Sequence, residues 1–382
     1  MRVLHTSDWH VGRTFHGRDL LAEQESVLTG LADLVTDERV DAVVVSGDLY
    51  DRAVPSAEAV ATCTRVLTAL AAAGTRIVIT PGNHDSAARL GAFAGFAEAG
   101  GLHLRTSAAD IARPVLLDDA HGPVALYGIP YLEPEPARHA LGDPSLRGHA
   151  GVLGEAMRRI RADLAARPAG TRSVVLSHAF VTGGAESDSE RTISVGGVPH
   201  VPSSTFDGVD YVALGHLHGP QELSPRLRYS GSPLAYSFSE ARHRKSVYLV
   251  ELGPEGLVDV ERRHLPVPRE LATARGELDD LLGDPGFAEL EDKFLSVELT
   301  DQVRPLEAMR RLRERFPHVA HLEWRPTGGL VELRYQEAVR GRSDEEVACC
   351  FVADARNGVE PDEADRALLR EALAAVAAEG RR

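Results

Sequence analysis

Five short polar clusters in this 382-residue sequence carry side chains that could bind metal ions. In chain order they are Asp8-Trp-His10, Gly47-Asp-Leu-Tyr-Asp51, Gly82-Asn-His-Asp85, Ser177-His178 and Gly215-His-Leu-His218. Carboxylate, imidazole and amide oxygen form a mixed oxygen and nitrogen ligand set, which suits manganese, iron or zinc better than magnesium. The clusters therefore predict a site for metal ions of the kind that assist hydrolysis.

Asp48 is the natural candidate to bridge two metal ions. It follows an apolar segment and Gly47, and the missing side chain of that glycine would let the turn approach the ions closely. The other predicted ligands form two sets: Asp8, His10 and His218 on one ion, and Asn83, His178 and His216 on the other.

Each cluster by itself has an ordinary structural explanation. An Asp-x-His after a strand is usually a cap or a turn, Gly-Asn-His-Asp can form an Asx turn, and His178 alone is more often a hydrogen-bonded core histidine. Coincidence is a weak explanation for five such clusters in series. Sites in α/β proteins gather where strands end, and each cluster follows a predicted strand or turn.

Short β-branched runs precede the clusters and are predicted to be buried strands that deliver side chains at their C-terminal ends. They lie at residues 3–5, 42–45, 76–79, 174–176 and 211–214. Helical spacing of apolar residues predicts two helices between the early strands. Their expected buried faces consist of Leu28, Leu31, Leu34 and Val35 in one helix, and Val60, Val66, Leu67 and Leu70 in the other.

Between about residues 124 and 252 the predicted strands lie closer together. Segments 226–229 and 246–252 are predicted to form a hairpin-like pair, connected by a stretch that opens with the turn Gly231-Ser-Pro. An α/β sandwich of sheets flanked by helices explains this order better than a simple doubly wound sheet.

The length of 382 residues exceeds what one hydrophobic core usually organises, so two or three domains are expected. The Pro-flanked stretch 264–269 predicts a boundary. The expected domains are residues 1–265, which contain all five clusters, a small α+β capping domain at 266–340, and a C-terminal helical segment at 341–382.

The capping domain is predicted to contain a helix at 306–315 and strands at 294–299, 319–324 and 330–334. The C-terminal segment is predicted to form two helices. The second has an apolar stripe formed by Leu368, Leu369, Leu373 and Val376.

The composition, with 43% hydrophobic and 26% charged residues, is ordinary for a globular protein. A cytoplasmic protein is expected, because no membrane span or signal segment is recognisable and Cys63, Cys349 and Cys350 form no CxxC pair. The net charge of −15 argues against DNA binding by this chain alone, since phosphate contacts rely on Lys and Arg. Bound divalent ions would reverse the local sign, and a partner could supply further DNA contacts.

With these motifs the sequence resembles the calcineurin-like metallophosphoesterases, and among them the SbcD-type nuclease subunits of bacterial SbcCD complexes. The resemblance rests on the five clusters and on the stretches 189–197, 210–218 and 229–234, followed by Lys245-Ser-Val. It implies a four-layer β-sandwich flanked by helices. It also implies a manganese-dependent double-strand exonuclease and single-strand or hairpin endonuclease for DNA repair and recombination, with an SbcC-type ATPase as partner.

The resemblance further implies residue roles and an assembly. One ion would be held by Asp8, His10, Asp48 and His218, and the other by Asp48, Asn83, His178 and His216. His84 would not be a ligand but would contact the scissile phosphate and assist the leaving oxygen, as an imidazole can. A homodimer within a heterotetramer is implied, formed through residues 87–100 or 131–140.

Asp51-Arg52 departs from the pattern, because many archaeal and eukaryotic relatives have a histidine here. An arginine could grip phosphate, as in protein phosphatases, so a phosphomonoesterase or cyclic-nucleotide phosphodiesterase is an alternative. Asp51 could instead orient a histidine or Arg52, which is the interpretation we favour. A non-catalytic scaffold is a third alternative, disfavoured because no predicted ligand is missing.

Two basic segments leave alternatives open. Residues 310–315 either contact the DNA backbone or form a solvated helix face. Residues 242–245 either contact the DNA backbone or form a charged hairpin tip. The apolar stripe of the last helix either covers the capping domain or, as the resemblance favours, docks on the coiled coil of the ATPase.

Overall fold

The structure is a computed structural model that describes residues 1–190, 200–327, 341–356 and 358–379. The chain divides into two compact units, Met1–Pro268 and Arg269–Arg382. The strand predicted at 330–334 and most of the stretch 189–197 lie outside the described residues. Among the described helices, none is both long enough and apolar enough to cross a membrane.

The first unit contains two six-stranded sheets, and the first of them has the order β14-β13-β1-β4-β5-β6. Strands β1, β4, β5 and β6 are parallel, whereas β13 and β14 are joined to β1 by antiparallel pairing. The bounds are β1 Arg2–Thr6, β4 Ala42–Ser46, β5 Arg76–Thr80, β6 Leu102–Leu104, β13 Ser246–Gly253 and β14 Gly256–His264.

The second sheet has the order β11-β12-β10-β9-β8-β7. Its four inner strands are parallel, and the two edge strands are antiparallel to their neighbours. The bounds are β7 Val115–Asp119, β8 Gly122–Ile129, β9 Arg172–His178, β10 Tyr211–Gly215, β11 Gln221–Ser224 and β12 Leu227–Tyr229. A small ribbon follows β1, formed by β2 Thr14–Phe15 and β3 Arg18–Asp19.

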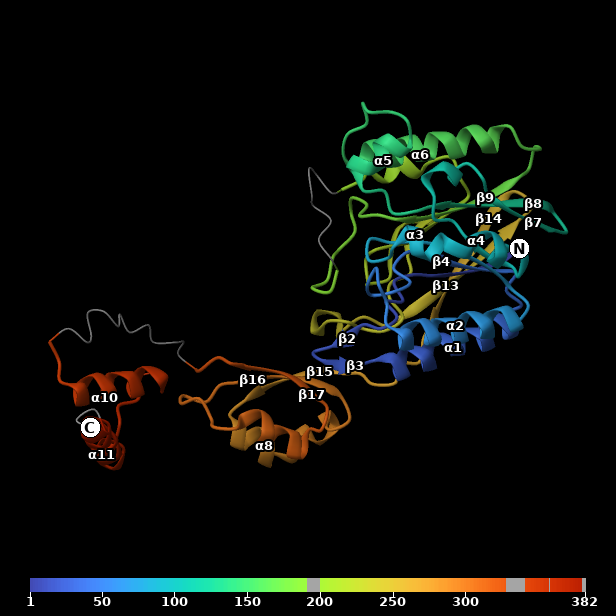
Figure 1. The fold of residues 1–382 in the computed structure, drawn as a ribbon. Helices are drawn as coiled ribbons and strands as arrows, with labels where there is room; N and C mark the ends of the chain where they lie inside the picture. Colours follow the sequence, from blue (N-terminus) through green and yellow to red (C-terminus); the bar gives the residue numbers. More distant parts are fainter. Residues whose placement is uncertain (191–199, 328–340, 357, 380–382) are drawn as a thin grey trace. The chain divides into compact units, whose positions relative to one another are not determined.

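Helices cover the outer face of each sheet, so the unit has four layers (Figure 1). Helices α1 and α2 pack on the first sheet, and α5 and α6 pack on the second. The bounds are α1 Leu21–Asp37, α2 Ala57–Ala72, α3 Ala87–Leu90, α4 Ala94–Ala99, α5 Pro134–Ala140 and α6 Gly148–Ala165.

Apolar side chains of the two sheets meet in a central core. Val44 and Val78 contribute from the first sheet and Leu126, Val174 and Leu176 from the second, all fully buried. Burial on both faces explains why these strands read as continuous apolar runs rather than as alternating patterns. The predicted α/β fold with a four-layer sandwich is confirmed.

The predicted helix faces are largely correct. In α2, Ser56 caps the N-terminus by accepting the Ala59 N–H, and Val66 and Leu70 are buried. Val60, however, is 41% exposed, because it lies outside the stripe that contacts the first sheet.

The predicted hairpin between 226–229 and 246–252 is wrong. Strand β12 belongs to the second sheet, whereas β13 lies in the first sheet between β1 and β14. Both segments have strand character, but β13 buries both of its faces. Tyr248 and Val250 enter the core between the sheets, and Val247 and Leu249 pack toward the helices.

The second unit contains a parallel three-stranded sheet with the order β15-β16-β17. Its core includes Leu281, Leu295, Leu312 and Phe316. The bounds are β15 Leu271–Gly276, α7 Leu278–Gly283, β16 Phe294–Leu299, α8 Ala308–Arg315 and β17 Val319–Trp324. The strands predicted at 294–299 and 319–324 are confirmed, while β15 was not predicted.

Two helices end the described chain, α10 Asp344–Ala355 and α11 Glu363–Glu379. Ser343 and Glu346 form a capping box that starts α10. The apolar stripe of α11 is divided. Leu369 and Leu373 line a hollow together with residues of α10, whereas Leu368 and Val376 are 65% and 67% exposed.

Candidate metal centre

The predicted ligands lie where parallel strands of both sheets end. Asp8 and His10 follow β1, Asp48 follows β4, Asn83 follows β5, His178 ends β9, and His216 and His218 follow β10. The carboxyl ends of parallel strands share one edge of a sheet, which is where α/β proteins assemble sites. The fold therefore brings the predicted ligands of all five motifs together in one cluster.

Asp48 occupies the centre of this cluster. Its Oδ2 atom lies 3.5 Å from His10 Nε2 and 3.5 Å from His178 Nε2. Three groups of candidate ligands are close enough to hold an ion, with the ligand atoms of each group within 4.8 Å of one another, and Asp8, His10 and Asp48 each belong to two groups. The groups are Asp8, His10 and His218; His10, Asp48 and His84; and Asp8, Asp48 and His178.

Lone pairs converge between His10 and His218. The Ser189 hydroxyl donates to Glu240 Oε1 and lies 2.6 Å from His218 Nδ1, which can then donate its own proton to Ser189. In a neutral ring this leaves a bare lone pair on His218 Nε2, which is 3.0 Å from His10 Nε2. A cation between such donors fits this arrangement.

A second convergence lies beside Asn83. His178 Nδ1 is 3.2 Å from the Ser46 carbonyl, which can only accept, so the proton belongs on Nδ1. His178 Nε2 then presents a lone pair 2.8 Å from Asn83 Oδ1, another acceptor. His216 Nε2 is buried without a hydrogen-bond partner among the described residues, and its ring centroid lies 5.2 Å from that of His178. These donors fit a second ion.

Burial shifts the pKa values of several groups in the cluster. It lowers the pKa of His10 and of His216 well below the ordinary histidine value, which favours the neutral imidazoles that metals require. Burial, followed by the charge of Asp48, raises the pKa of Asp8 well above its ordinary value. A bound dication would reverse that effect, because it would be the largest charge in the site.

The backbone of the cluster is strained. Asp8, His10, Asp48 and His216 have φ angles of 53°, 46°, 47° and 107°, a region that residues with side chains rarely adopt. Hydrogen bonds between the first two turns hold this geometry: Asp8 N–H donates to Gly47 O and His10 N–H donates to Asp48 O. Such strain persists at functional sites where surrounding contacts determine it.

Glycines allow the turns to approach. A Cβ at Gly215 would lie 1.7 Å from the Ser46 carbonyl oxygen, and one at Gly82 would lie 2.1 Å from Asp48 Oδ1. Only a residue without a side chain fits at these points. The glycines in the motifs are thus required by the close packing of the turns.

His84 lies at the edge of the cluster, with its side chain 14% exposed. Its N–H donates to Asp48 Oδ1 at 2.9 Å, and its Nδ1 lies 2.8 Å from the Asp51 carbonyl, so Nδ1 carries a proton and Nε2 remains available. His84 also belongs to a ligand group with His10 and Asp48. Distance alone therefore permits it to be either a ligand or a catalyst.

Asp51 faces the histidines rather than solvent. Its Oδ1 atom lies 3.7 Å from His10 Nδ1, 4.0 Å from His84 Nδ1 and 3.8 Å from Arg13 Nε. These contacts support an orienting role. The Arg52 side chain is 80% exposed and lies 3.7 Å from the other Asp51 oxygen.

Some supporting residues were missed in the sequence. Asp85 accepts the N–H groups of Leu49, Tyr50 and Gly82, and burial followed by the Asp48 charge raises its pKa to about 7. Gln24, which lies in α1, donates hydrogen bonds to the carbonyls of Trp9 and His10. Asp85 stands inside a motif and could have been found there, whereas nothing near Gln24 in the sequence marks it.

Both interpretations of the basic segment 242–245 are wrong for Lys245. It is neither a hairpin tip nor available to DNA, because it is 2% exposed and bonded to Glu240. The basic segment 310–315 also has carboxylate partners: Arg310 pairs with Glu307 and Glu314, and Arg315 pairs with Glu291. That pairing favours the solvated-face interpretation.

Comparison with known proteins identifies two domains. Residues 1–220 match the calcineurin-like phosphoesterase family, and residues 267–355 match the SbcD C-terminal family described as the type 5 capsule protein repressor C-terminal domain. A crystal structure of a Thermus thermophilus protein is 13% identical, covering 69% of this chain and 98% of that one, with a TM-score of 0.39. A Danio rerio dimetal phosphatase is 15% identical, covering 70% and 99%, with a TM-score of 0.41. The family match spans more than half of the sequence, and the chain belongs to the calcineurin-like phosphoesterases, which are metal-dependent hydrolases.

Proposed function

We propose that this chain is the manganese-dependent nuclease subunit of an SbcCD-type complex. It would act on DNA as a double-strand exonuclease and as a single-strand and hairpin endonuclease, together with an SbcC-type ATPase. One observation carries the proposal: a phosphoesterase domain with a buried cluster of candidate metal ligands and an SbcD-type C-terminal domain occur in the same chain. A phosphatase of small substrates would not require the second domain.

In this proposal Asp48 would be a ligand of both ions. Asp8, His10 and His218 complete one site, and Asn83, His178 and His216 complete the other. Two divalent ions would supply Lewis acidity that polarises the phosphodiester and activates water. Manganese fits a ligand set of carboxylates, imidazoles and an amide oxygen better than magnesium does, since magnesium prefers oxygen ligands.

His84 would act on the leaving group. The Asp51 carbonyl accepts the proton of His84 Nδ1 and so orients the ring with Nε2 available to hold a proton. A protonated Nε2 could donate to the departing sugar oxygen, which is the work of a general acid. Asp51 and Arg13 supply the nearby charges that would keep the ring in this orientation.

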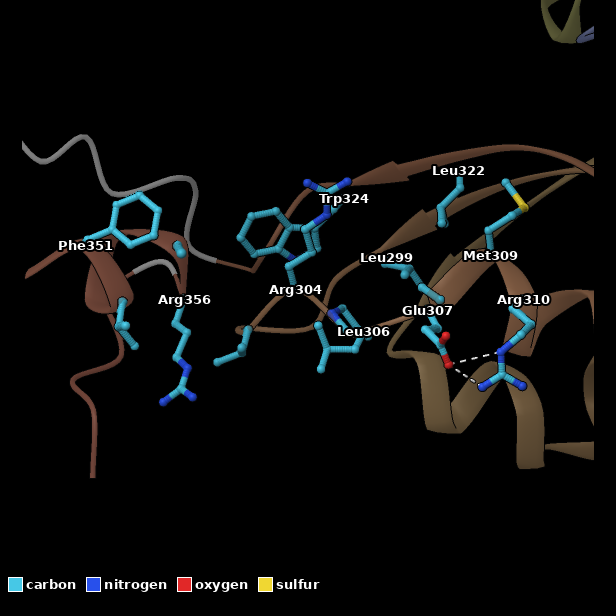
Figure 2. A pocket seen from close by; sticks show the side chains of 15 residues that line it. Leu299, Arg304, Leu306, Glu307, Met309, Arg310, Leu322, Trp324, Phe351 and Arg356 are labelled. Atoms are coloured by element: carbon cyan, nitrogen blue, oxygen red, sulfur yellow. Dashed lines mark hydrogen bonds and ion pairs between the residues drawn. The ribbon is translucent and has the colours of Figure 1, made fainter. Parts of the chain in front are cut away.

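The ATPase would bind to the second unit. A hollow of about 810 Å³ lies there, lined mainly by apolar side chains from β16, β17, α8, α10 and the loop 303–307. Figure 2 shows Leu306, Trp324 and Phe351 among its lining residues. Leu306 is 86% exposed and Phe351 is 59% exposed, and both line this hollow; contiguous exposed apolar patches commonly mark protein interfaces.

A homodimer would use the region 87–100. Phe93 and Phe96 are 73% and 84% exposed in or beside α4, which is uncommon for phenylalanine on the surface of a monomer. The segment 131–140 is less suited, because Leu132 and Ala137 are buried. We therefore favour the first of the two surfaces for the dimer.

The second candidate function is that of a phosphomonoesterase or cyclic-nucleotide phosphodiesterase, and Arg52 is the reason for it. The exposed guanidinium of Arg52 lies beside Asp51, next to the candidate metal ligands, and could bind a terminal phosphate. Supercoiled and linear DNA with Mn²⁺, assayed beside para-nitrophenyl phosphate, would separate the two activities. DNA cleavage that EDTA abolishes supports the nuclease, whereas para-nitrophenyl phosphate hydrolysis without any DNA cleavage would overturn it. The Asp48→Asn protein controls for contaminating nucleases.

A further inference from the structure

A buried lysine lies beside the cluster of candidate metal ligands. The chain has only two lysines, Lys245 and Lys293, among 42 basic residues. Lys293 pairs with Glu270 at the surface of the second unit, with 30% of its side chain exposed. Lys245 is 2% exposed, and a charge in such a place is costly unless it is paired and fully hydrogen-bonded.

Lys245 meets these conditions. Its Nζ atom donates to Glu240 Oε2, to Ser232 Oγ at 3.0 Å and to the His218 carbonyl at 3.0 Å. An ammonium group has three donors, so three acceptors satisfy it completely. A guanidinium is larger and planar and would not match this set, which gives a physical reason for lysine in a chain that otherwise uses arginine.

The hydrogen bonds continue from Lys245 to the ring of His218. Glu240 is buried together with Lys245, its ion-pair partner. Its Oε1 atom accepts a hydrogen bond from the Ser189 hydroxyl, with 2.6 Å between the two oxygen atoms. Ser189 Oγ in turn lies 2.6 Å from His218 Nδ1. The order is therefore Lys245, Glu240, Ser189 and His218, and the last two steps join segments that are far apart in the sequence.

His218 is held on its backbone as well. Its N–H donates to Glu190 Oε1 at 2.8 Å, and its carbonyl accepts the Lys245 ammonium. Ring, N–H and carbonyl are thus all engaged by residues that are not predicted metal ligands. Buried polar groups are normally hydrogen-bonded, but here two of the three partners, Ser189 and Lys245, are also linked to each other through Glu240.

We infer that Ser189, Glu240 and Lys245 are positioning residues that hold His218 with Nδ1 protonated and Nε2 directed at one of the two ions. This inference rests on the proposed metal centre and adds residues to it. The carboxylate of Glu240 keeps Ser189 acting as an acceptor toward Nδ1, and the charge of Lys245 keeps Glu240 ionised in a buried position. Orienting groups of this kind typically change metal affinity about 10-fold to 100-fold when removed.

The grouping of the ligand atoms also predicts which ion is affected. His218 lies with Asp8 and His10 in one group, while His178 lies in another. Loss of the positioning residues should therefore weaken one Mn²⁺ and spare the other. A purely structural role would lower the stability of the fold without selecting one ion.

The test is a Mn²⁺ titration of the full-length chain, followed by the electron paramagnetic resonance signal of free Mn²⁺. Wild type is expected to bind two ions. Ser189→Ala and Lys245→Met should weaken one ion about 10-fold to 100-fold and leave the other within about twofold. Ser189→Thr keeps the hydroxyl and should restore binding. Lys293→Met is the matched control and should resemble wild type, because its pair lies on the surface.

Thermal melting without metal checks that each variant folds. If Lys245→Met does not fold, Ser189→Ala alone tests the positioning role. Two ions bound with wild-type affinity in both variants would overturn the positioning role alone. Fewer than two ions bound by wild type, or unchanged binding in His218→Ala, would instead overturn the metal centre itself. Equal weakening of both ions would also contradict the inference.

Discussion

Charged groups are used differently in the two units. In the first unit, Lys245 and Glu240 form a pair whose side chains are 1% and 0% exposed, beside a cluster of buried histidines. In the second unit, Arg310 pairs with Glu314 on α8, and their side chains are 63% and 68% exposed. Buried polar groups destabilise the fold unless every partner is in place, whereas exposed pairs contribute little.

This difference indicates where substitutions should matter. Around the candidate site of the first unit a single altered atom leaves another buried group without its partner, so chemistry and folding should both be sensitive. In the second unit water can replace a lost partner. Effects there should appear mainly when a partner protein binds to its exposed apolar side chains.

Asp48→Asn should have the largest effect in the first unit. One carboxylate would serve both ions, and an amide cannot replace its charge, so both metals and all hydrolytic activity should be lost. Metal analysis after dialysis measures this directly. Asp292→Asn, an exposed position in the second unit, is the matched control. Two tightly bound ions in the Asp48→Asn protein would contradict the bridging role.

Removing residues from Ser343 onward should have the largest effect in the second unit. ATP-dependent digestion of duplex ends should fail, while manganese-dependent cutting of single-stranded DNA should persist, because every proposed ligand lies before residue 219. The exposed Leu368 and Val376 would each contribute about 1.5–3 kcal/mol if a partner buried them. Co-purification with an SbcC-type ATPase tests this, and equal binding by both forms would refute it.

Gly215→Ala should destabilise the first unit by about 3 kcal/mol or more, since its Cβ would lie 1.7 Å from the Ser46 carbonyl oxygen. Gly154→Ala offers the contrast. It lies within α6 with open space around its Cβ position, so alanine there should stabilise by about 0.5–1 kcal/mol. Urea denaturation of both variants measures the difference, and equal midpoints would show that the close approach is unimportant.

His84→Ala separates ligand from catalyst. We expect near-normal Mn²⁺ affinity with turnover lower by about 100-fold or more, the effect of losing a general acid. Isothermal titration with Mn²⁺ and a single-turnover cleavage assay provide the two quantities. If metal affinity falls together with the rate, then His84 is a ligand, as its distance from His10 and Asp48 would allow.

Arg310→Gln should have the smallest effect, below about 1 kcal/mol in the free energy of unfolding, because Glu307 and Glu314 hold the arginine at an exposed position. DNA affinity should also remain unchanged. If the variant instead binds DNA more weakly, and if the dependence of its DNA affinity on salt corresponds to about one fewer released counterion, then Arg310 contacts a phosphate.

The strands that carry the predicted metal ligands were predictable because their runs are buried on both faces and end in polar residues. Residues 42–45 and 211–214 are examples, found within one residue of β4 and β10. The hairpin assigned to 226–229 and 246–252 was not predictable in this way. Strand character is local, but pairing depends on which sheet buries the strand, as β13 demonstrates between β1 and β14.

The candidate ligand types could be predicted without coordinates, because Asp8, Asp48 and His178 stand in motifs whose chemistry is evident from residue type and spacing. The groups that surround them could not be predicted, since they come from segments that meet only in the folded chain. Lys245 looked like part of an exposed basic segment, yet the fold buries it against Glu240 and the carbonyl of His218. Residue type and spacing determine which groups can bind a metal. The tautomer and direction of a ligand, however, are set by hydrogen bonds from distant segments, and those exist only when the two sheets have packed together.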